Sequence, residues 1–416
     1  MTEPPGAGAE FATDPNILKE DYEAFRPETA DDRPTVLQVL PALVSGGVER
    51  GTVDVASALV NAGWRALVVS NGGPMVREVE RVGAEHIQIP VHSKNPLHWR
   101  ASYDALVDLI WTENVDLVHA RSRLPAWLAY GAARRSKVPF VTTFHQRPDA
   151  ATALKRKYNA VMTRGDRVIA ISHYVAQKLL DTYGMDPVRL RVIPRGVDLS
   201  MFDPDKVTAE RMIRLVNKWR VPDGVPIVML PARVTEWKGH RLLLDALALL
   251  ERGSFHCLMV GDDSRDRVKS GLERHVAKLG LSPYVHFVGK TDDMPAAYKL
   301  ADVVVSSSID PEPFGRVMIE AQAMGRPIVA ADHGGARESV IAGETGWLFA
   351  PGNARALADG ITNALSLEED ARMELTAKAV AHVRQGFSRY QMCARTLSVY
   401  GELLGGTVAD DLEPSA

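Results

Sequence analysis

The sequence predicts an α/β protein of two similar halves, each a doubly wound parallel sheet, that face one another across a cleft. Two observations lead to this fold class. From residue 35 onward, short apolar runs alternate with longer stretches whose apolar residues recur at i, i+3 and i+4. The alternation pauses in a turn-rich stretch at 192–207 and then starts again. Such alternation is typical of βαβ units, in which helices cover both faces of a parallel sheet.

The expected elements follow in order along the chain. The predicted strands of the first half are TVLQVLPAL (35–43), RALVVSN (65–71), HIQIPV (86–91), DLVHA (116–120), FVTTF (140–144) and RVIAIS (167–172). The helical stretches between them include 48–63, 95–114 and 124–136. After a helix near 208–219, the second half has the predicted strands PIVMLPA (226–232), FHCLMVG (255–261), VHFVG (285–289), DVVVSSS (302–308), PIVAAD (327–332) and GWLF (346–349). Two helical stretches, 354–367 and 390–404, end the pattern.

Length and charge suggest how the chain is divided. Its 416 residues, 46% of them hydrophobic, suffice for two domains. We predict domains at 34–205 and 206–385, then a helix at 386–405 for which packing back on the N-terminal domain is one option. Residues 1–32 carry a net charge of −7 and residues 402–416 a net charge of −4, which leaves +8 for the body. The segments 1–33 and 406–416 are therefore predicted to be a flexible acidic extension and a flexible tail.

Several classes of protein are excluded by composition. The two cysteines, Cys257 and Cys393, form no CxxC or Cys/His cluster, which argues against a disulfide scaffold and a zinc site and suits a reducing cytosol. No run of about 18 apolar residues predicts a transmembrane helix, and the N-terminus lacks the apolar core of a signal peptide. We expect a cytoplasmic protein with no nucleic-acid partner.

Parallel sheets bind ligands at the carboxyl ends of their strands, so the residues after each strand are candidates. Gly46 and Gly47 precede a helix, where glycines let a ligand approach the backbone and free N–H groups attract anions. Their spacing is not that of a GxGxxG fingerprint, and a plain turn explains them equally well. Arg233 ends a strand and Lys238 opens the next helix, as in a diphosphate clamp; two solvated bases are the alternative.

Two further strand ends carry weaker signals. One is Gly-Asp-Asp at 261–263, and the other is VGKTDDM at 288–294. At the second, the backbone of Gly289 could hold the edge of a nucleobase while Val288 and Met294 cover its faces. Strand-end Gly-Asp pairs are usually only turns, which is the alternative for both.

The stretch EPFGRVMIE, residues 312–320, places two acids around a predicted strand-to-helix turn. If the helix begins near Gly315, Glu312 lies in the loop before it and Glu320 lies in its second turn. Each carboxylate can accept hydrogen bonds from paired ligand hydroxyls, as on a ribose, and the N–H groups of Phe314 and Gly315 point the same way. A helix-start acid and a solvated acid would explain either residue alone.

These motifs together resemble a known family. EPFGRVMIEAQAMGRPIVA is similar to the E-x-F-G-x-x-x-x-E signature of GT-B-fold retaining glycosyltransferases of family 4. Six features occur in the family's order over about residues 35–370. They are the Gly-Gly-Val loop, VIPRGVD, the Arg and Lys-Gly pair, a strand followed by Gly-Asp, this motif and GGARE…GETGWLF. The resemblance implies two Rossmann-like domains, with the acceptor bound by the N-terminal one and the donor by the C-terminal one. HARSRLPAW, TTFHQ and VIPRGVD also resemble lipopolysaccharide-core and cell-envelope members.

The resemblance implies roles for the C-terminal residues. Arg233 and Lys238 match the pair that neutralises the donor diphosphate. Glu320 matches the acid that binds the nucleotide ribose, and Glu312 matches the acid at the sugar hydroxyls. The cations stabilise charge on the leaving phosphate, a task that a metal performs in other transferases.

Five more residues take roles from the resemblance. Phe314 and Gly315 supply backbone contacts to the sugar, and Gly46 and Gly47 meet phosphate and acceptor. His145, in TTFHQ, resembles the histidine placed near the transferred sugar; a structural histidine at a strand end is the alternative.

The implied reaction moves a hexosyl group, such as mannosyl or glucosyl, from a GDP- or UDP-linked sugar to a saccharide or lipid-linked acceptor, with retention of configuration. Neither a cofactor nor a metal is expected, and the DPD triplet at 203–205 is interpreted as turn chemistry. Two alternatives remain: a non-catalytic scaffold or nucleotide-sugar sensor, and a nucleotide-sugar epimerase or hydrolase.

Residues 119–165 hold ten bases and a single acid, Asp149. The bases are Arg121, Arg123, Arg134, Arg135, Lys137, Arg147, Lys155, Arg156, Lys157 and Arg164. A solvated charged face explains any one helix of this kind, but the whole segment favours an anionic acceptor or an anionic membrane surface at the inner leaflet.

Overall fold

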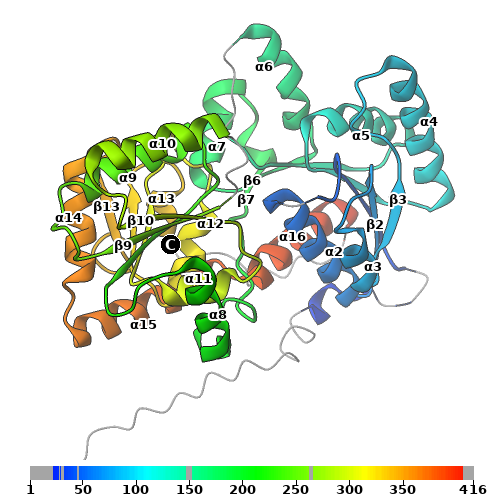
Figure 1. Cartoon of the computed structure of the whole chain (residues 1–416). Coiled ribbons are helices and arrows are strands. Elements are labelled where there is room, and N and C mark those ends of the chain that lie inside the picture. The colour runs from blue at the N-terminus through cyan, green and yellow to red at the C-terminus, as the bar shows by residue number, and fades with distance from the viewer. Residues whose placement is uncertain are drawn as a thin grey trace, which may run out of the picture.

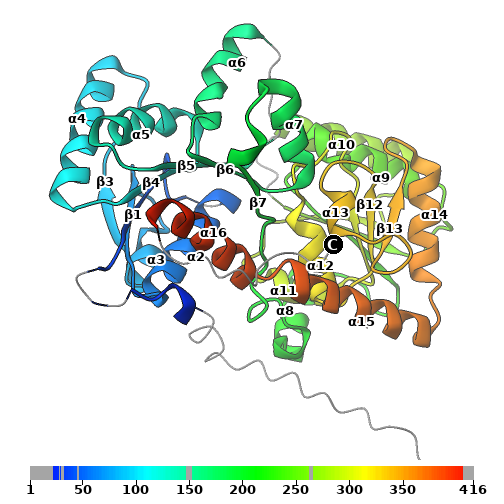
Figure 2. The same cartoon turned by 180° about the vertical axis from the view of Figure 1, so that it is seen from behind.

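Two parallel sheets, each sandwiched between helices, form the two halves of the molecule (Figures 1 and 2), and the predicted fold class is confirmed. The structure is a computed structural model that describes residues 22–27, 29, 32–44, 46–146, 152–261 and 266–405. Most of the predicted acidic extension, the predicted tail, Arg147, Asp149 and the two aspartates of Gly-Asp-Asp lie outside the described residues.

The first sheet has the strand order β3-β2-β1-β4-β5-β6-β7. Its strands are β1 (Thr35–Val39), β2 (Arg65–Ser70), β3 (Glu85–Gln88), β4 (Leu117–Ala120), β5 (Phe140–Phe144), β6 (Arg167–Ala170) and β7 (Leu190–Val192). Its helices are α2 (Gly47–Asn61), α3 (Val76–Arg81), α4 (Pro96–Thr112), α5 (Arg123–Ser136), α6 (Ala153–Asn159) and α7 (His173–Tyr183). The short edge strand β7 lies at the start of the turn-rich stretch, where the sequence pattern did not predict a strand.

The second sheet has the strand order β10-β9-β8-β11-β12-β13. Its strands are β8 (Ile227–Pro231), β9 (His256–Val260), β10 (Val285–Gly289), β11 (Val303–Ser306), β12 (Ile328–Ala331) and β13 (Trp347–Phe349). Its helices are α8 (Ala209–Trp219), α9 (His240–Leu247), α10 (Asp266–Leu279), α11 (Met294–Leu300), α12 (Arg316–Ala323), α13 (Ala336–Ser339), α14 (Ala354–Leu365) and α15 (Glu369–Gly386). No helix in the described ranges combines the length and apolar character needed to cross a membrane.

The strand order explains where ligands can bind. In each sheet the chain winds outward in one direction and then returns to continue in the other, so the order reverses between β1 and β4 and between β8 and β11. The loops after these central strands diverge and leave a crevice at their carboxyl ends. All five residues of β1 and of β8 are buried, as expected for strands covered on both faces.

The last helix, α16 (Arg389–Leu404), leaves the second half and packs against α2 of the first half (Figure 2). Its Tyr400 is fully buried there, with its hydroxyl 2.6 Å from Nδ1 of His119 on β4. The chain thus crosses between the halves twice, once before α8 and once between α15 and α16. The predicted domain bounds remain predictions.

Candidate active site

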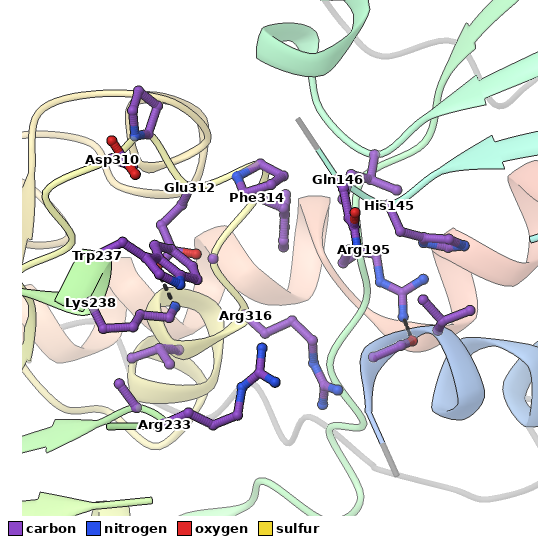
Figure 3. A pocket seen from close by; sticks show the side chains of 18 of the residues that line it. His145, Gln146, Arg195, Arg233, Trp237, Lys238, Asp310, Glu312, Phe314 and Arg316 are labelled. Atoms are coloured by element: carbon purple, nitrogen blue, oxygen red, sulfur yellow. Dashed lines mark hydrogen bonds and ion pairs between the residues drawn. The ribbon is translucent and has the colours of Figure 1, made fainter. Parts of the chain in front are cut away.

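A cleft of about 720 Å³ lies between the two halves, at the carboxyl ends of β1, β5, β8 and β11 (Figure 3). It brings together seven of the predicted site residues: Gly47, His145, Arg233, Lys238, Glu312, Phe314 and Gly315. Gly46, Gly289, Met294 and Glu320 are not among the described residues that line it. Gly47 and Gly315, almost 270 positions apart in the sequence, therefore line the same cleft.

Lys238 and Glu312 form an ion pair on the wall built by the second half. Glu312 is buried, and the Ser308 hydroxyl donates a second hydrogen bond to the same carboxylate oxygen, Oε1, at 2.5 Å. The ammonium of Lys238 also lies 4.3 Å from the centre of the Trp237 ring, a cation–π contact. Gly239 allows this arrangement, because it has φ +72° and a Cβ there would lie 1.7 Å from the carbonyl oxygen of Ser307.

The Phe-Gly step turns the chain from β11 into α12. Gly315 has φ +85° and precedes the first residue of the helix, so a side chain there would be strained. Phe314 is buried, with the centre of its ring 5.8 Å from that of Phe387, and it is one of the residues that line the cleft. The backbone N–H of Gly335 donates to the carbonyl oxygen of Glu312 at 2.9 Å and fixes the loop from the other side.

Glu320 lies behind the cleft wall and already has two partners. The Tyr298 hydroxyl donates to Oε2 at 2.8 Å, and Nη2 of Arg316 lies 2.8 Å from Oε1. Burial, and then the neighbouring carboxylate, hold the pKa of Tyr298 well above its usual value, so the phenol stays a donor. The pair of partners orients the carboxylate and leaves it only 9% exposed.

His145 directly follows β5 and lies opposite the ion pair (Figure 3). Its Nε2 is buried and has no hydrogen-bond partner among the described residues. Burial lowers the pKa of His145 well below its usual value, and the positive charges of Arg195 and Arg121 lower it further. The imidazole is therefore neutral near pH 7, with one ring nitrogen left unsatisfied.

Thirteen of the twenty described residues that line the cleft were not predicted as site residues, and three of these thirteen are Arg195, Arg316 and Trp237. Arg195 donates through Nη2 to the carbonyl oxygen of Gly47 and so joins the linker to the start of α2. Burial, and then the charges of Arg316 and Arg121, lower the pKa of Arg195 to about 9. Arg195 lies in the motif VIPRGVD and Arg316 lies in EPFGRVMIE, so a search for cations within these motifs could have found both arginines.

The described residues contain no group of three or more His, Cys, Asp or Glu side chains arranged to hold a metal ion. The DPD triplet forms a turn, as interpreted from the sequence. Asp203 accepts a hydrogen bond from the backbone N–H of Asp205 at 3.0 Å and begins the short 3-10 helix Pro204–Lys206.

Family models match both halves of the chain. Residues 213–380 match the model described as Glycosyl transferases group 1, and residues 45–201 match the model described as Glycosyltransferase Family 4. A D-inositol 3-phosphate glycosyltransferase of Nocardia farcinica is 32% identical over 314 residues, which cover 70% of this chain and 67% of that protein.

Solved structures match the whole arrangement of the two halves. A glycosyltransferase from Rickettsia africae superposes with a TM-score of 0.84 at 38% identity, covering 90% of this chain and 100% of that chain. Anabaena HepE in complex with UDP-glucose superposes with a TM-score of 0.78 at 24% identity, covering 89% of this chain and 100% of that chain. At that identity the second match shows the fold alone.

Proposed function

Since the chain belongs to the glycosyltransferases of group 1 and family 4, we propose that it moves a hexosyl group, such as glucosyl or mannosyl, from a nucleoside-diphosphate sugar to a saccharide or lipid-linked acceptor. The observation that carries the proposal is the shared cleft. Two cations and a buried carboxylate on one wall face a neutral histidine on the other. A diphosphate, a sugar and an acceptor would each find a partner there.

In this proposal Arg233 and Lys238 bind the diphosphate and stabilise the charge that develops on the leaving phosphate. Glu312 accepts hydrogen bonds from the sugar hydroxyls, and Glu320 from the ribose hydroxyls. Neutral His145 meets the transferred sugar as a hydrogen-bond partner, since an imidazolium would repel the positive charge that forms on the sugar ring. The backbone of Phe314 and Gly315 contacts the sugar, and that of Gly46 and Gly47 contacts phosphate and acceptor.

We further propose retention of configuration by attack on the front face. The bond from sugar C1 to the phosphate oxygen breaks, the bond from C1 to the acceptor oxygen forms on the same face, and the acceptor proton passes to the leaving phosphate. Because Arg233 and Lys238 supply positive charge at the phosphate, the reaction is proposed to need neither a divalent metal nor a cofactor.

The donor base is proposed to bind beside Gly289 and Met294, at the end of β10 and the start of α11. The fold shared with a UDP-glucose complex favours UDP over GDP as the first nucleotide to test. The acceptor is proposed to belong to cell-envelope glycan synthesis of the lipopolysaccharide kind, on the motif resemblance, with the protein in the cytoplasm at the inner membrane surface. Helix α6 supports the surface contact, since Leu154, which is 79% exposed, lies beside exposed basic residues.

Calorimetry with UDP and GDP, followed by incubation with the matching nucleotide sugars, tests the proposal. We expect one nucleotide to bind and its sugar to be hydrolysed slowly without acceptor and transferred faster with one. NMR of the product anomer tests retention, and activity that persists in excess EDTA tests metal independence. Nucleotide binding with no turnover of any donor would favour the scaffold alternative, and release of an epimerised sugar would favour the epimerase.

A further inference from the structure

Arg316 is the first residue of α12, and it, rather than Glu320, lines the cleft. Its half-buried side chain extends from the second half toward the opposite wall, as Figure 3 shows. Nη2 of Arg316 lies 2.8 Å from Oε1 of Glu320, one turn further along the helix. The guanidinium therefore contacts the carboxylate that is proposed to bind the ribose.

A cation at this position is poorly satisfied. The start of a helix carries partial positive charge, and an ion pair whose cation precedes its anion by four residues opposes the helix dipole. Nε of Arg316 is buried and has no hydrogen-bond partner among the described residues. The charge of Arg316 also lowers the pKa of Arg195, after the larger effect of burial. An anion in the adjoining part of the cleft would stabilise the guanidinium in all three respects.

The side chain of Arg316 reaches across the cleft to the start of α2. Its Cδ lies 4.0 Å from the point that a Cβ on Gly47 would occupy, and Nη2 of Arg195 lies 3.7 Å from that point. The described lining residues of the cleft include five cations and two acids: Arg123, Arg195, Arg233, Lys238, Arg316, Asp310 and Glu312. The space in front of Arg316 thus has an excess of positive charge, which suits a diphosphate.

We propose that Arg316 is an exchangeable cation of the donor site. The ribose hydroxyls displace its guanidinium from Glu320, and the released guanidinium turns onto the diphosphate beside Arg233 and Lys238. The inference rests on the proposed glycosyl transfer and adds a residue to its donor site. Through this exchange, recognition of the nucleoside and recognition of the diphosphate depend on each other. A nucleoside without phosphates must break the ion pair and offers the guanidinium no other partner, whereas a nucleoside diphosphate offers it a stronger one.

Competition calorimetry with uridine and UDP tests the exchange, because uridine carries the ribose without the diphosphate. We expect Arg316→Met to bind UDP about tenfold more weakly than the wild type, since a charge-assisted contact with the diphosphate is lost. The same variant should bind uridine about two- to fivefold more tightly, because no ion pair has to be broken. Arg316→Lys keeps a positive charge and should recover most of the UDP affinity. If GDP is the nucleotide that binds, guanosine and GDP take the place of uridine and UDP.

The matched control is Arg100→Met. Arg100 forms an ion pair of the same i, i+4 kind with Asp104, at 3.1 Å on the exposed face of α4. Its removal should leave the binding of both ligands as in the wild type. Circular dichroism reports whether Arg316→Met is folded; if it is not, Arg316→Gln, which keeps a polar end, carries the same two expectations.

The opposite signs distinguish exchange from a structural role. An arginine that only holds Glu320 in place would weaken the binding of uridine and UDP together when removed, and this result would overturn the inference. Uridine that competes no better for Arg316→Met than for the wild type would also overturn it. If UDP and GDP both fail to bind the wild type, the proposed function fails and the exchange fails with it. If one of them binds and the two signs are not opposite, the exchange alone is wrong.

Discussion

At the scale of single residues, the ion pair between Lys238 and Glu312 is the central feature of the cleft. Each charge neutralises the other in a largely buried place, and the ion pair holds both side chains in position. A diphosphate would compete for Lys238 while sugar hydroxyls satisfy Glu312. The ion pair thus keeps both side chains in place for a ligand, and neither charge is buried without a partner.

Removing either cation should slow transfer. We expect Arg233→Ala and Lys238→Ala each to lose about 2–4 kcal/mol of transition-state stabilisation, roughly a 30- to 1,000-fold fall in kcat/KM. Lys238→Ala should show the larger loss, because it also leaves Glu312 without its cation. Steady-state kinetics with the donor found by calorimetry measures the effect, and Arg241→Ala, exposed on α9, is the control. Wild-type rates in both variants would falsify the clamp.

The proposed contact of Glu320 with the ribose can be tested by changing both the residue and the nucleotide. If its carboxylate binds the ribose, 2′-deoxy-UDP should bind the wild type more weakly than UDP does, and Glu320→Gln should reduce that difference. Tyr298→Phe, which removes the 2.8 Å hydrogen bond but keeps the carboxylate, should have a smaller effect. Calorimetry of both nucleotides with all three proteins measures the coupling. An undiminished preference for UDP in Glu320→Gln would exclude the ribose contact.

The sequence predicted the residues on the second wall better than the contacts between the walls. Arg233, Lys238 and Glu312 follow neighbouring strands, so the rule for parallel sheets was enough to bring them together. The contact of Arg195 with Gly47 joins positions 148 residues apart, and the buried Arg121 donates a hydrogen bond to Gln38, 83 residues before it. Such contacts depend on how distant segments pack together, and a local sequence pattern does not contain that information.

At the scale of elements, α6 is the exposed part of the basic segment that the sequence singled out. Both views show it standing away from the sheet (Figures 1 and 2). Lys155, Arg156 and Lys157 are exposed on it, with Leu154 and Tyr158 on either side. A short helix with three bases and exposed apolar side chains can lie on an anionic membrane.

We expect the protein to sediment with anionic vesicles at low salt and to be released at high salt. Each basic residue near such a surface contributes about 1 kcal/mol, so reversing Lys155, Arg156 and Lys157 to Glu should weaken binding at least 100-fold. Arg274→Glu with Lys278→Glu, two exposed positions on α10, is the matched control. Equal absence of binding to anionic and neutral vesicles would rule out the membrane surface.

Element boundaries also show what the pattern could not predict. The strand β7 (Leu190–Val192) has only three residues, none of them fully buried, and so it carries no clear period. The helix α16 was expected from its apolar spacing, with packing back on the N-terminal domain as one option. The contact of its Tyr400 with His119 joins distant segments and was not predicted.

At the scale of the whole molecule, two contacts from the second half hold the start of α7 in the first. Ser172, just before the helix, donates through its hydroxyl to the carbonyl oxygen of Pro313, beside Glu312, at 2.5 Å. The carboxylate of Glu338 on α13 accepts hydrogen bonds from the backbone N–H groups of His173 and Tyr174, both at 2.7 Å. A carboxylate at a helix N-terminus is favourable, and here it joins the two walls of the cleft.

Weakening this junction should loosen the contact between the two halves without touching the donor clamp. We expect Glu338→Gln to lose about 1–2 kcal/mol at the junction, because the amide offers one acceptor where the carboxylate offers two, and the site is partly exposed. The open form lets water reach the donor, so the ratio of donor hydrolysis to transfer should rise several-fold while UDP affinity changes little. Small-angle scattering of the UDP complex should show a larger radius of gyration than for Glu344→Gln, an exposed control. Unchanged scattering together with an unchanged hydrolysis ratio would mean that Glu338 caps α7 without controlling closure.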